Sequence, residues 1–175
     1  MTFELQKWSE AHWQGFATMQ RDPDVMADLG GPFDEDASRE KFERYSIAWK
    51  DNGISRWAVV DHQSGRFLGY AGVMLRADAE HPLGSHYEIG WRFCRDAWGR
   101  GLATDSARQA LDRAWSTLNI PEIVSYTAAD NIRSQNVMKR LDLRRDPDRD
   151  FTARYPKGDW TGLMWVADNP TIAPQ

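Results

Sequence analysis

The apolar residues of this chain follow two spacings, one typical of helices and one typical of strands. Within residues 37–49 and 11–19 they recur at intervals of three and four, which predicts two helices in the first third of the chain. Short apolar runs at 56–61 and 67–75 flank the segment His-Gln-Ser-Gly. This arrangement predicts an antiparallel hairpin with Gly65 in its turn.

The middle of the chain predicts a parallel crossover. Residues 87–93 have the composition of a strand, residues 102–118 carry an apolar face at helical spacing, and residues 123–128 form a second strand-like run. A strand, a helix and a strand in this order favour one right-handed parallel unit. A further short helix is predicted at 132–141.

These elements together predict an α+β (mixed α/β) fold: a central, mostly antiparallel sheet with one parallel crossover, flanked by helices. Gly69 and Gly72 lie inside a predicted strand and indicate a bulge or a close backbone approach. At 175 residues the chain favours a single domain spanning 1–175, and we expect residues 168–175 to form a frayed tail. The remaining predicted strands are residues 3–8, 150–155 and 160–167.

Composition narrows the class of protein. Cys94 is the single cysteine, so no intramolecular disulfide can form and a reducing compartment is expected. The N-terminus lacks the pattern of a secretory signal and the apolar runs are too short to span a bilayer, so we predict a cytoplasmic protein without a membrane partner. The net charge of −4 weighs against nucleic acid as the main partner.

The negative charge is unevenly placed. Residues 21–52 contain nine acidic and five basic side chains. This stretch is either a solvated helix surface or an acidic rim that attracts a cationic partner.

Residues 95–105 read Arg-Asp-Ala-Trp-Gly-Arg-Gly-Leu-Ala-Thr-Asp, a glycine-bearing loop between a strand and a helix. The first N–H groups of a helix lack partners within the helix, and glycine lets an anion approach the backbone closely. The run does not contain the GxxxxGK[ST] sequence of a P-loop, and Thr104 stands where a dinucleotide fingerprint needs its third glycine. Spacing alone leaves two alternatives, an anion site and a plain glycine turn.

The segment from Trp98 to Ala103 resembles the acetyl-CoA pyrophosphate loop of the GNAT N-acetyltransferases, [Gln/Arg]-x-x-Gly-x-[Gly/Ala]. Trp98 replaces the usual Gln or Arg, but Trp-Gly-x-Gly followed by Ala-Thr is typical of the RimJ/RimL-like, ribosomal-protein alanine acetyltransferase branch. Residues 88–91, Glu-Ile-Gly-Trp, and the Asn-x-x-Ser helix that starts at Asn131 also resemble this branch. The helix departs from the usual Leu-Gly-Phe ending.

This resemblance implies acetyl-CoA as the co-substrate, held by a loop and by two splayed strands. Backbone contacts to the pantetheine arm would come from Trp91 and Phe93, and a backbone N–H near Trp91 would polarise the thioester carbonyl. Arg133, Lys139 and Arg140 are either ligands of the 3′-phosphate or a solvated helix face. The residues implied in cofactor binding are Trp91, Phe93, Trp98, Gly99, Arg100, Gly101, Leu102, Ala103, Thr104, Asn131 and Ser134.

The resemblance also implies direct attack of an amine on the thioester. Glu88 is the leading general base, directly or through a water, although a strand carboxylate facing solvent or paired with an arginine is an equal alternative. Ser134 is the candidate acid for the departing thiolate, or else a hydrogen-bond partner of the sulfur or a helix cap. Asp130 is a weaker base candidate, and Tyr126 and Tyr155 are alternative acids.

Other chemistries have less support. Cys94 fits a small buried thiol better than a nucleophile, because no histidine lies near it in sequence. The four histidines lack metal-ligand spacing, so we expect no metal. A non-catalytic acyl-CoA-binding or sensor module on the same fold is the alternative to an enzyme.

The acceptor is the least defined part of the prediction. It is an amine, either a peptide N-terminus or a small amine, and the protein is expected to be a monomer or a homodimer. The N-terminal helices would build the acceptor site, with aromatic residues that serve equally well as core: Trp8, Trp13, Phe33, Tyr45 and Trp49.

Overall fold

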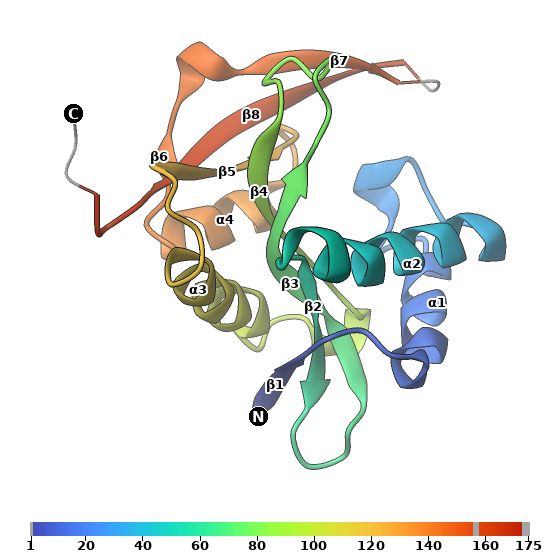
Figure 1. Ribbon diagram of the computed structural model, residues 1–175. Helices are drawn as coiled ribbons and strands as arrows, with labels where there is room; N and C mark the ends of the chain where they lie inside the picture. The colour runs from blue at the N-terminus through green and yellow to red at the C-terminus, as the bar shows by residue number, and fades with distance from the viewer. Residues whose placement is uncertain (1, 156–157, 173–175) are drawn as a thin grey trace.

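The structure is a computed structural model that describes residues 2–155 and 158–172 (Figure 1). The helices are α1 (Trp13–Arg21), α2 (Glu35–Asn52), α3 (Leu102–Trp115) and α4 (Ile132–Arg140), with short 3-10 turns η1 (Glu10–His12), η2 (Ala27–Leu29), η3 (Arg95–Ala97) and η4 (Pro147–Arg149). The strands are β1 (Phe3–Gln6), β2 (Arg56–Asp61), β3 (Phe67–Arg76), β4 (His86–Phe93), β5 (Glu122–Thr127), β6 (Arg144–Arg145), β7 (Phe151–Tyr155) and β8 (Gly158–Asp168).

One sheet organises the molecule. Its strand order is β1-β2-β3-β4-β5-β8-β6, with β7 paired to β8 as a hairpin. All pairs are antiparallel except β4 and β5, whose parallel pairing is confined to Glu88 opposite Val124. The predicted mixed α/β fold with one parallel crossover is therefore confirmed. Beyond that single pair β4 and β5 run in different directions (Figure 1).

Helices cover both faces of the sheet. α1 and α2 pack on one face, which we call the α2 face, and α3 and α4 lie on the other, the α3 face (Figure 1). Phe16 and Phe42 join Tyr70 of β3 in the core of the α2 face. Ile89 of β4 is fully buried among α3 residues such as Ala107 in the core of the α3 face. Since side chains alternate along a strand, β4 presents different residues to each face.

Two glycines in β3 allow close contact with neighbouring strands, as predicted. A Cβ on Gly69 would lie 2.7 Å from the Cα of Phe93, and a Cβ on Gly72 would lie 2.9 Å from the Cα of Arg56. The register between β2 and β3 also shifts between Val59 and Val60. The backbones therefore approach more closely here than a side chain permits.

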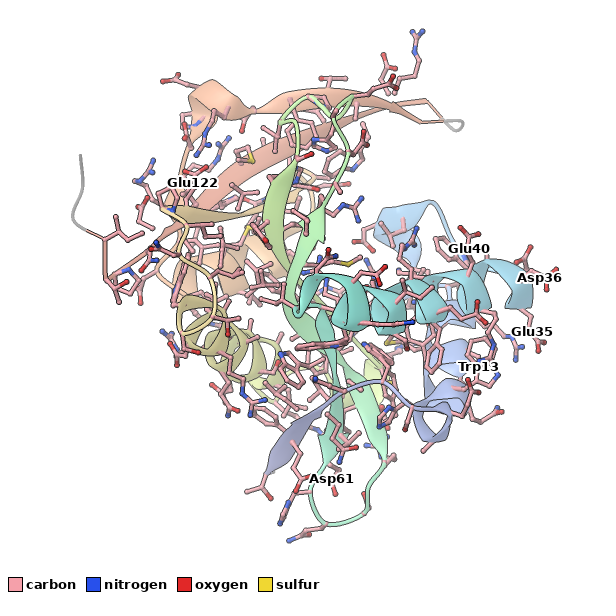
Figure 2. The ribbon with its side chains drawn as sticks, viewed as in Figure 1. Trp13, Glu35, Asp36, Glu40, Asp61 and Glu122 are labelled. Atoms are coloured by element: carbon pink, nitrogen blue, oxygen red, sulfur yellow. The ribbon has the colours of Figure 1, made fainter. Side chains whose placement is uncertain are left out.

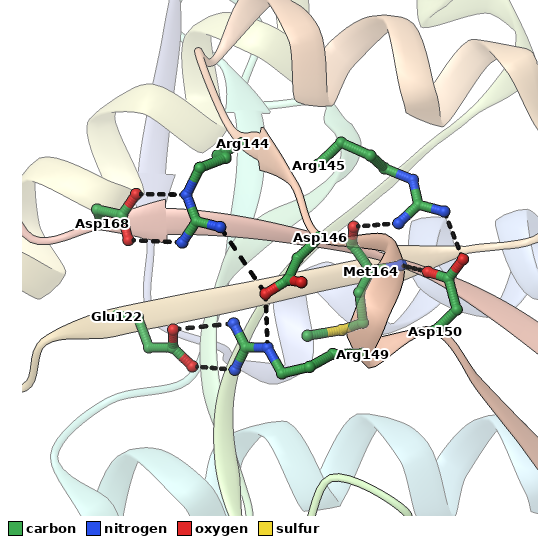
Figure 3. Close-up of polar contacts among 8 residues, drawn as sticks. All are labelled: Glu122, Arg144, Arg145, Asp146, Arg149, Asp150, Met164 and Asp168. Atoms are coloured by element: carbon green, nitrogen blue, oxygen red, sulfur yellow. Dashed lines mark hydrogen bonds and ion pairs between the residues drawn. The ribbon is translucent and has the colours of Figure 1, made fainter.

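Salt bridges hold the chain after α4 against the sheet (Figure 3). Arg149 makes a forked pair with Glu122 at 2.6 and 3.0 Å, and Arg144 contacts Asp168 at 3.1 Å. Both arginines also reach Asp146. The groups are partly exposed, so each pair adds little stability, but together they fix the path of β6 and η4 across β5 and β8.

The C-terminal tail is more ordered than expected, and the prediction that it frays from residue 168 is wrong over the described part. Asp168 ends β8, and Asn169 is 4% exposed. The Asn169 side chain donates to the Ile120 carbonyl at 2.9 Å and its backbone N–H to Pro121 at 2.8 Å. These bonds to the segment before β5 hold the tail in place, and residues 173–175 lie outside the described residues.

Candidate functional site

A cleft of roughly 580 Å³ opens between the end of β4, the loop before α3 and the start of α4. All eleven residues that the sequence named for cofactor binding line it: Trp91, Phe93, Trp98, Gly99, Arg100, Gly101, Leu102, Ala103, Thr104, Asn131 and Ser134. Asp130, Arg133 and Arg140 also line the cleft, whereas Glu88, Lys139 and Tyr126 are not among its lining residues. Tyr155 ends β7, and its side chain lies outside the described part of the structure.

The glycine loop has the geometry of an anion cradle. Gly99 and Gly101 have φ angles of 75° and 76°, in the left-handed region that glycine adopts without strain. Gly101 is the N-cap of α3, so the first N–H groups of that helix have no partner within it and the positive end of its dipole faces the cleft. A Cβ on Gly99 would meet no atom within 4 Å. Glycine is thus required here by backbone conformation and leaves the loop surface open to a phosphate group.

The contacts of Trp98 show why a tryptophan suits the position that usually holds Gln or Arg. Its indole N–H donates to the Phe93 carbonyl at 2.9 Å and so ties the loop to the end of β4. The Arg133 guanidinium of α4 lies 4.0 Å from the centre of the indole ring. This cation–π contact joins the two sides of the cleft through their side chains. Trp91 and Phe93 are the two predicted backbone contacts of the pantetheine arm. The carbonyl of Phe93 already accepts the hydrogen bond from Trp98.

The edge of β4 at Trp91 is open for pairing. The bond from the Cys94 N–H to the Leu68 carbonyl and the register of β3 with β4 place the backbone groups of even-numbered β4 residues toward β3. The N–H and C=O of Trp91 therefore point toward β5, where strand pairing ends at Glu88 and Val124. A peptide-like chain entering the cleft finds a strand edge with unused donors and acceptors.

A serine marks the point where β4 and β5 separate. The buried Ser125 hydroxyl donates to the Ile89 carbonyl at 2.9 Å, one residue beyond the last strand pair. This side-chain bond replaces the next backbone bond of the ladder. After Ile89, Trp91 is the next residue of β4 whose backbone N–H and C=O point toward β5.

The start of α4 forms the opposite wall of the cleft. The side-chain oxygen of Asn131 accepts a hydrogen bond from the Ser134 backbone N–H at 3.2 Å and caps the helix. Asn131 therefore carries the capping role that was one alternative for Ser134. The Ser134 side chain lines the cleft in the first turn of α4.

Glu88 lies on the α2 face. Its carboxylate is 3.0 Å from the Arg56 guanidinium and 3.8 Å from that of Arg76, and its side chain is 14% exposed. The Arg56 guanidinium also donates to the Glu88 and Gly72 carbonyls. The predicted alternative of a strand carboxylate paired with arginine is what the structure shows. A base role would need the amine to arrive from the α2 face.

A polar cluster buried on the α2 face was not predicted from sequence. The Tyr70 phenol interacts with Lys41, Arg92 and Tyr45, and Lys41 is only 7% exposed. Burial opposes ionisation of Tyr70, but the cations of Lys41 and Arg92 outweigh it and lower its pKa to about 7. Burial also lowers the pKa of Lys41. The residues are 22 to 51 positions apart from one another in sequence, apart from Lys41 and Tyr45, so no local motif marks the cluster.

Arg92 links this cluster to the cleft. Its guanidinium forms a fork with Asp28 of η2 at 2.7 and 2.9 Å and donates to the Val25 carbonyl. Arg92, Val25 and Asp28 all line the cleft. The segment between α1 and α2 is thereby fixed over the end of β4.

The acidic stretch of residues 21–52 does not form one rim. Asp28 pairs with Arg92, Asp24 with Arg95, and Asp34 caps α2. Glu35, Asp36 and Glu40 lie at the outer end of α2 (Figure 2), and Glu35 pairs with Arg21. Trp8 and Tyr45 are buried in the core, and Trp13, Phe33 and Trp49 pack against it, so packing accounts for the five aromatic residues proposed to line the acceptor site.

Cys94 has the character of a buried thiol, as the sequence indicated. Burial raises its pKa to about 11, so the thiol stays protonated at neutral pH. It packs against both core clusters around β3 and β4. This environment does not suit a nucleophile.

The comparison with known proteins gives the family. Residues 2–144 match the Acetyltransferase (GNAT) domain family. The chain belongs to this family. The predicted enzyme class, an acetyl-CoA-dependent N-acetyltransferase, and the predicted co-substrate are thereby confirmed.

Individual relatives agree with this assignment. The chain is 26% identical to the uncharacterized N-acetyltransferase YnaD of Bacillus subtilis over 89% of this chain and 86% of that protein. An acetyltransferase from Agrobacterium tumefaciens superimposes with a TM-score of 0.75 at 24% identity, covering 94% of this chain and 90% of the other. Spermidine N-acetyltransferase from Vibrio cholerae, solved with CoA and spermine, superimposes with a TM-score of 0.73 at 16% identity, covering 95% of each chain.

Within the described residues, no helix is long and apolar enough to cross a membrane.

Proposed function

We propose that this protein transfers the acetyl group of acetyl-CoA to a primary amine, either a protein N-terminus or a small-molecule amine, by direct attack. One observation carries the proposal. The open edge of β4 at Trp91 and the left-handed loop at Gly99 and Gly101 border the same cleft. A strand edge suits the amide-containing pantetheine arm, and a helix N-terminus suits the pyrophosphate.

Each wall of the cleft has a proposed task. The backbone from Gly99 to Thr104 holds the pyrophosphate, and Arg100 adds positive charge at the rim. Trp91 pairs with the pantetheine arm, and its N–H, or one next to it, polarises the thioester carbonyl. Leu102 and Ala103 let the cofactor approach the loop closely. Asn131 keeps the start of α4 in position.

The amine arrives protonated and must lose two protons in all. In water the pKa of an α-amine is about 7.7–8.0 and that of the lysine side chain is about 10.4. One proton leaves with a base and the other reaches the departing sulfur. We propose that Glu88 attracts and orients the ammonium, directly or through a water, from the α2 face. The hydroxyl of Ser134 faces the departing thiolate from the cleft.

Further features are part of the proposal. The Trp-Gly-x-Gly-x-Ala-Thr sequence supports membership of the RimJ/RimL-like branch. We propose one catalytic domain that spans residues 1–175, acting in the cytoplasm as a monomer or homodimer. The spermidine acetyltransferase shares the fold, so polyamines belong in any screen of acceptors.

The loop assignment is tested by binding. Gly101→Trp should abolish acetyl-CoA binding measured by calorimetry, because the side chain fills the phosphate position. Gly65→Trp is the matched control, since Gly65 also has a positive φ, of 69°, and lies in open space in the β2–β3 turn. Normal affinity in Gly101→Trp, or equal loss in both variants, contradicts the assignment.

The catalytic assignment is tested by turnover. Release of free thiol from acetyl-CoA is measured with peptides and small amines, first with the wild type. Glu88→Gln and Ser134→Ala should lower turnover while affinity for CoA is kept. If the wild type binds acetyl-CoA but acetylates no amine in a broad panel, the non-catalytic sensor is the correct function.

A further inference from the structure

A tyrosine and a histidine form a hydrogen-bonded pair on the α2 face, beside the point where β4 and β5 separate. Tyr126 lies on β5, two residues beyond the last strand pair at Val124. Its side chain is on the same face as Val124, since both belong to one cluster with Phe151 and Met164. The Tyr126 hydroxyl is 3.3 Å from Nε2 of His86, which lies 40 residues earlier at the start of β4.

The direction of this hydrogen bond follows from its surroundings. Nδ1 of His86 is 2.6 Å from the Gly84 carbonyl, and a carbonyl only accepts. Nδ1 therefore carries the proton in the neutral ring. Nε2 then has a lone pair, which accepts the hydroxyl proton of Tyr126. A neighbouring histidine has the opposite arrangement, because Nδ1 of His81 accepts from the Leu83 N–H at 3.1 Å.

We infer that Tyr126 is a catalytic residue that takes the proton from the acceptor ammonium and passes its own hydroxyl proton to Nε2 of His86. The inference rests on the proposed function. In this step an N–H bond of the ammonium breaks, a new O–H bond forms on Tyr126, and the original hydroxyl proton moves to His86. The amine is left neutral with a lone pair, and His86 becomes an imidazolium held by the Gly84 carbonyl.

The proton has a route to solvent from His86. The ring lines a second cavity of about 550 Å³ on the opposite side of the Glu88–Val124 pair from the cleft. Glu122, Asp148, Arg149 and Asp150 also line this cavity, with Glu122 paired to Arg149 and Asp150 to Arg145. The relay therefore removes the proton away from the thioester.

This pair suits proton removal better than Glu88 does. The Glu88 carboxylate is held by the guanidinium of Arg56 and by that of Arg76, whereas the partner of Nε2 of His86 is a hydroxyl that can give up its proton. The charged and titratable groups nearest His86 are Arg76, its partner on β3, the ring of His81 and the hydroxyl of Tyr126. His81 in turn interacts with Asp78 and Glu88. The second cavity adds Glu122 from β5 and Asp148, Arg149 and Asp150 from the η4 segment.

The tautomer gives a test that does not depend on turnover. Long-range ¹H–¹⁵N spectra of the full chain should show His86 with its proton on Nδ1 and His81 with its proton on Nε2. The His86 signals are assigned by their loss in His86→Gln. A proton on Nε2 of His86 at neutral pH overturns the relay, whatever amine the enzyme accepts.

Kinetics give the second test. With an amine that the wild type acetylates, Tyr126→Phe should lower kcat on the order of 100-fold, while acetyl-CoA affinity is kept and the ring still packs on Phe151 and Trp160. Tyr87→Phe is the control, because Tyr87 packs on the α3 face, and its kcat should equal that of the wild type.

The pH profile separates the relay from a structural effect. The acidic limb of kcat should disappear in Tyr126→Phe and His86→Gln but persist in Glu88→Gln. If the limb disappears in Glu88→Gln and persists in His86→Gln, Glu88 is the base and the relay is wrong. If the wild type acetylates no amine, the proposed function fails, and the tautomer alone decides whether the pair is arranged as a relay.

Discussion

The guanidinium of Arg56 lies against Gly90 and pairs with Glu88 at 3.0 Å. A Cβ on Gly90 would come within 2.9 Å of Nη2 of Arg56. Gly90 therefore leaves room for a buried cation beside a candidate catalytic carboxylate. Glycine is therefore needed in the Glu-Ile-Gly-Trp sequence because of Arg56, a side chain 34 residues away in sequence.

Gly90→Ala should destabilise the protein because Arg56 must move from a buried, hydrogen-bonded position. Overpacking of this kind costs about 1–3 kcal/mol. Urea unfolding measures the loss. The same substitution made in an Arg56→Ala background should cost much less, because the obstacle is gone. Equal costs in both backgrounds contradict the steric explanation.

Local patterns predicted most of the fold. The apolar spacing within each element depends on neighbours in sequence, so β2 has the predicted bounds and most others differ by one to three residues at an end. β6 was not predicted because Arg144 and Arg145 are a strand only through their pairing with Val166 and Trp165 of β8. That pairing is a long-range contact between residues without a strand-like pattern.

The candidate site was predicted unevenly for the same reason. The loop and the start of α4 are contiguous motifs, and the cleft is lined by every residue named from them. The partner of Glu88, Arg56, and the partner of Tyr126, His86, lie on other strands, 32 and 40 positions away, so no adjacent residue marks them. Arg56 begins an apolar predicted strand, and a charge buried there needs a partner. This pattern could have predicted a carboxylate close to Arg56, but not which one.

The backbone conformation of Gly101 gives a prediction about substitution. Asparagine adopts the left-handed region more readily than valine does. Gly101→Asn should therefore lower the melting temperature less than Gly101→Val, and circular dichroism measures both. Since the site of a Cβ is open, with the nearest atom of Asp105 at 3.7 Å, steric clash does not contribute. Equal destabilisation by both residues is inconsistent with a conformational cause.

Arg133 should affect CoA binding through Trp98 and not through the 3′-phosphate. Loss of a cation–π contact is worth about 0.5–1 kcal/mol, so Arg133→Gln should weaken CoA binding roughly two- to fivefold. Dephospho-CoA should lose affinity by the same factor in calorimetry. Lys139→Gln, on the same helix but outside the cleft lining, is the control. A loss confined to CoA would assign Arg133 to the 3′-phosphate.

Cys94 should be dispensable for catalysis. Its raised pKa, about 11, leaves almost no thiolate at pH 7, because burial disfavours the charged form. Cys94→Ala should retain wild-type kcat, and iodoacetamide should label the folded wild type slowly, as mass spectrometry can record. Rapid labelling at neutral pH, or loss of turnover in a folded Cys94→Ala protein, argues for a covalent route through this thiol.

Tyr70 should ionise near neutral pH in the folded protein. Its pKa is lowered to about 7 because Lys41 and Arg92 outweigh the effect of burial. The unfolded chain, with a tyrosine pKa of about 10, holds more protons between pH 7 and 10, so the free energy of unfolding should rise with pH in this window. Ultraviolet difference spectra at the tyrosinate band should show one group titrating near pH 7, absent in Tyr70→Phe. In Lys41→Met the same transition should move to higher pH, because burial then opposes ionisation with one cation fewer. An unchanged transition in Lys41→Met means that Lys41 does not set the ionisation of Tyr70.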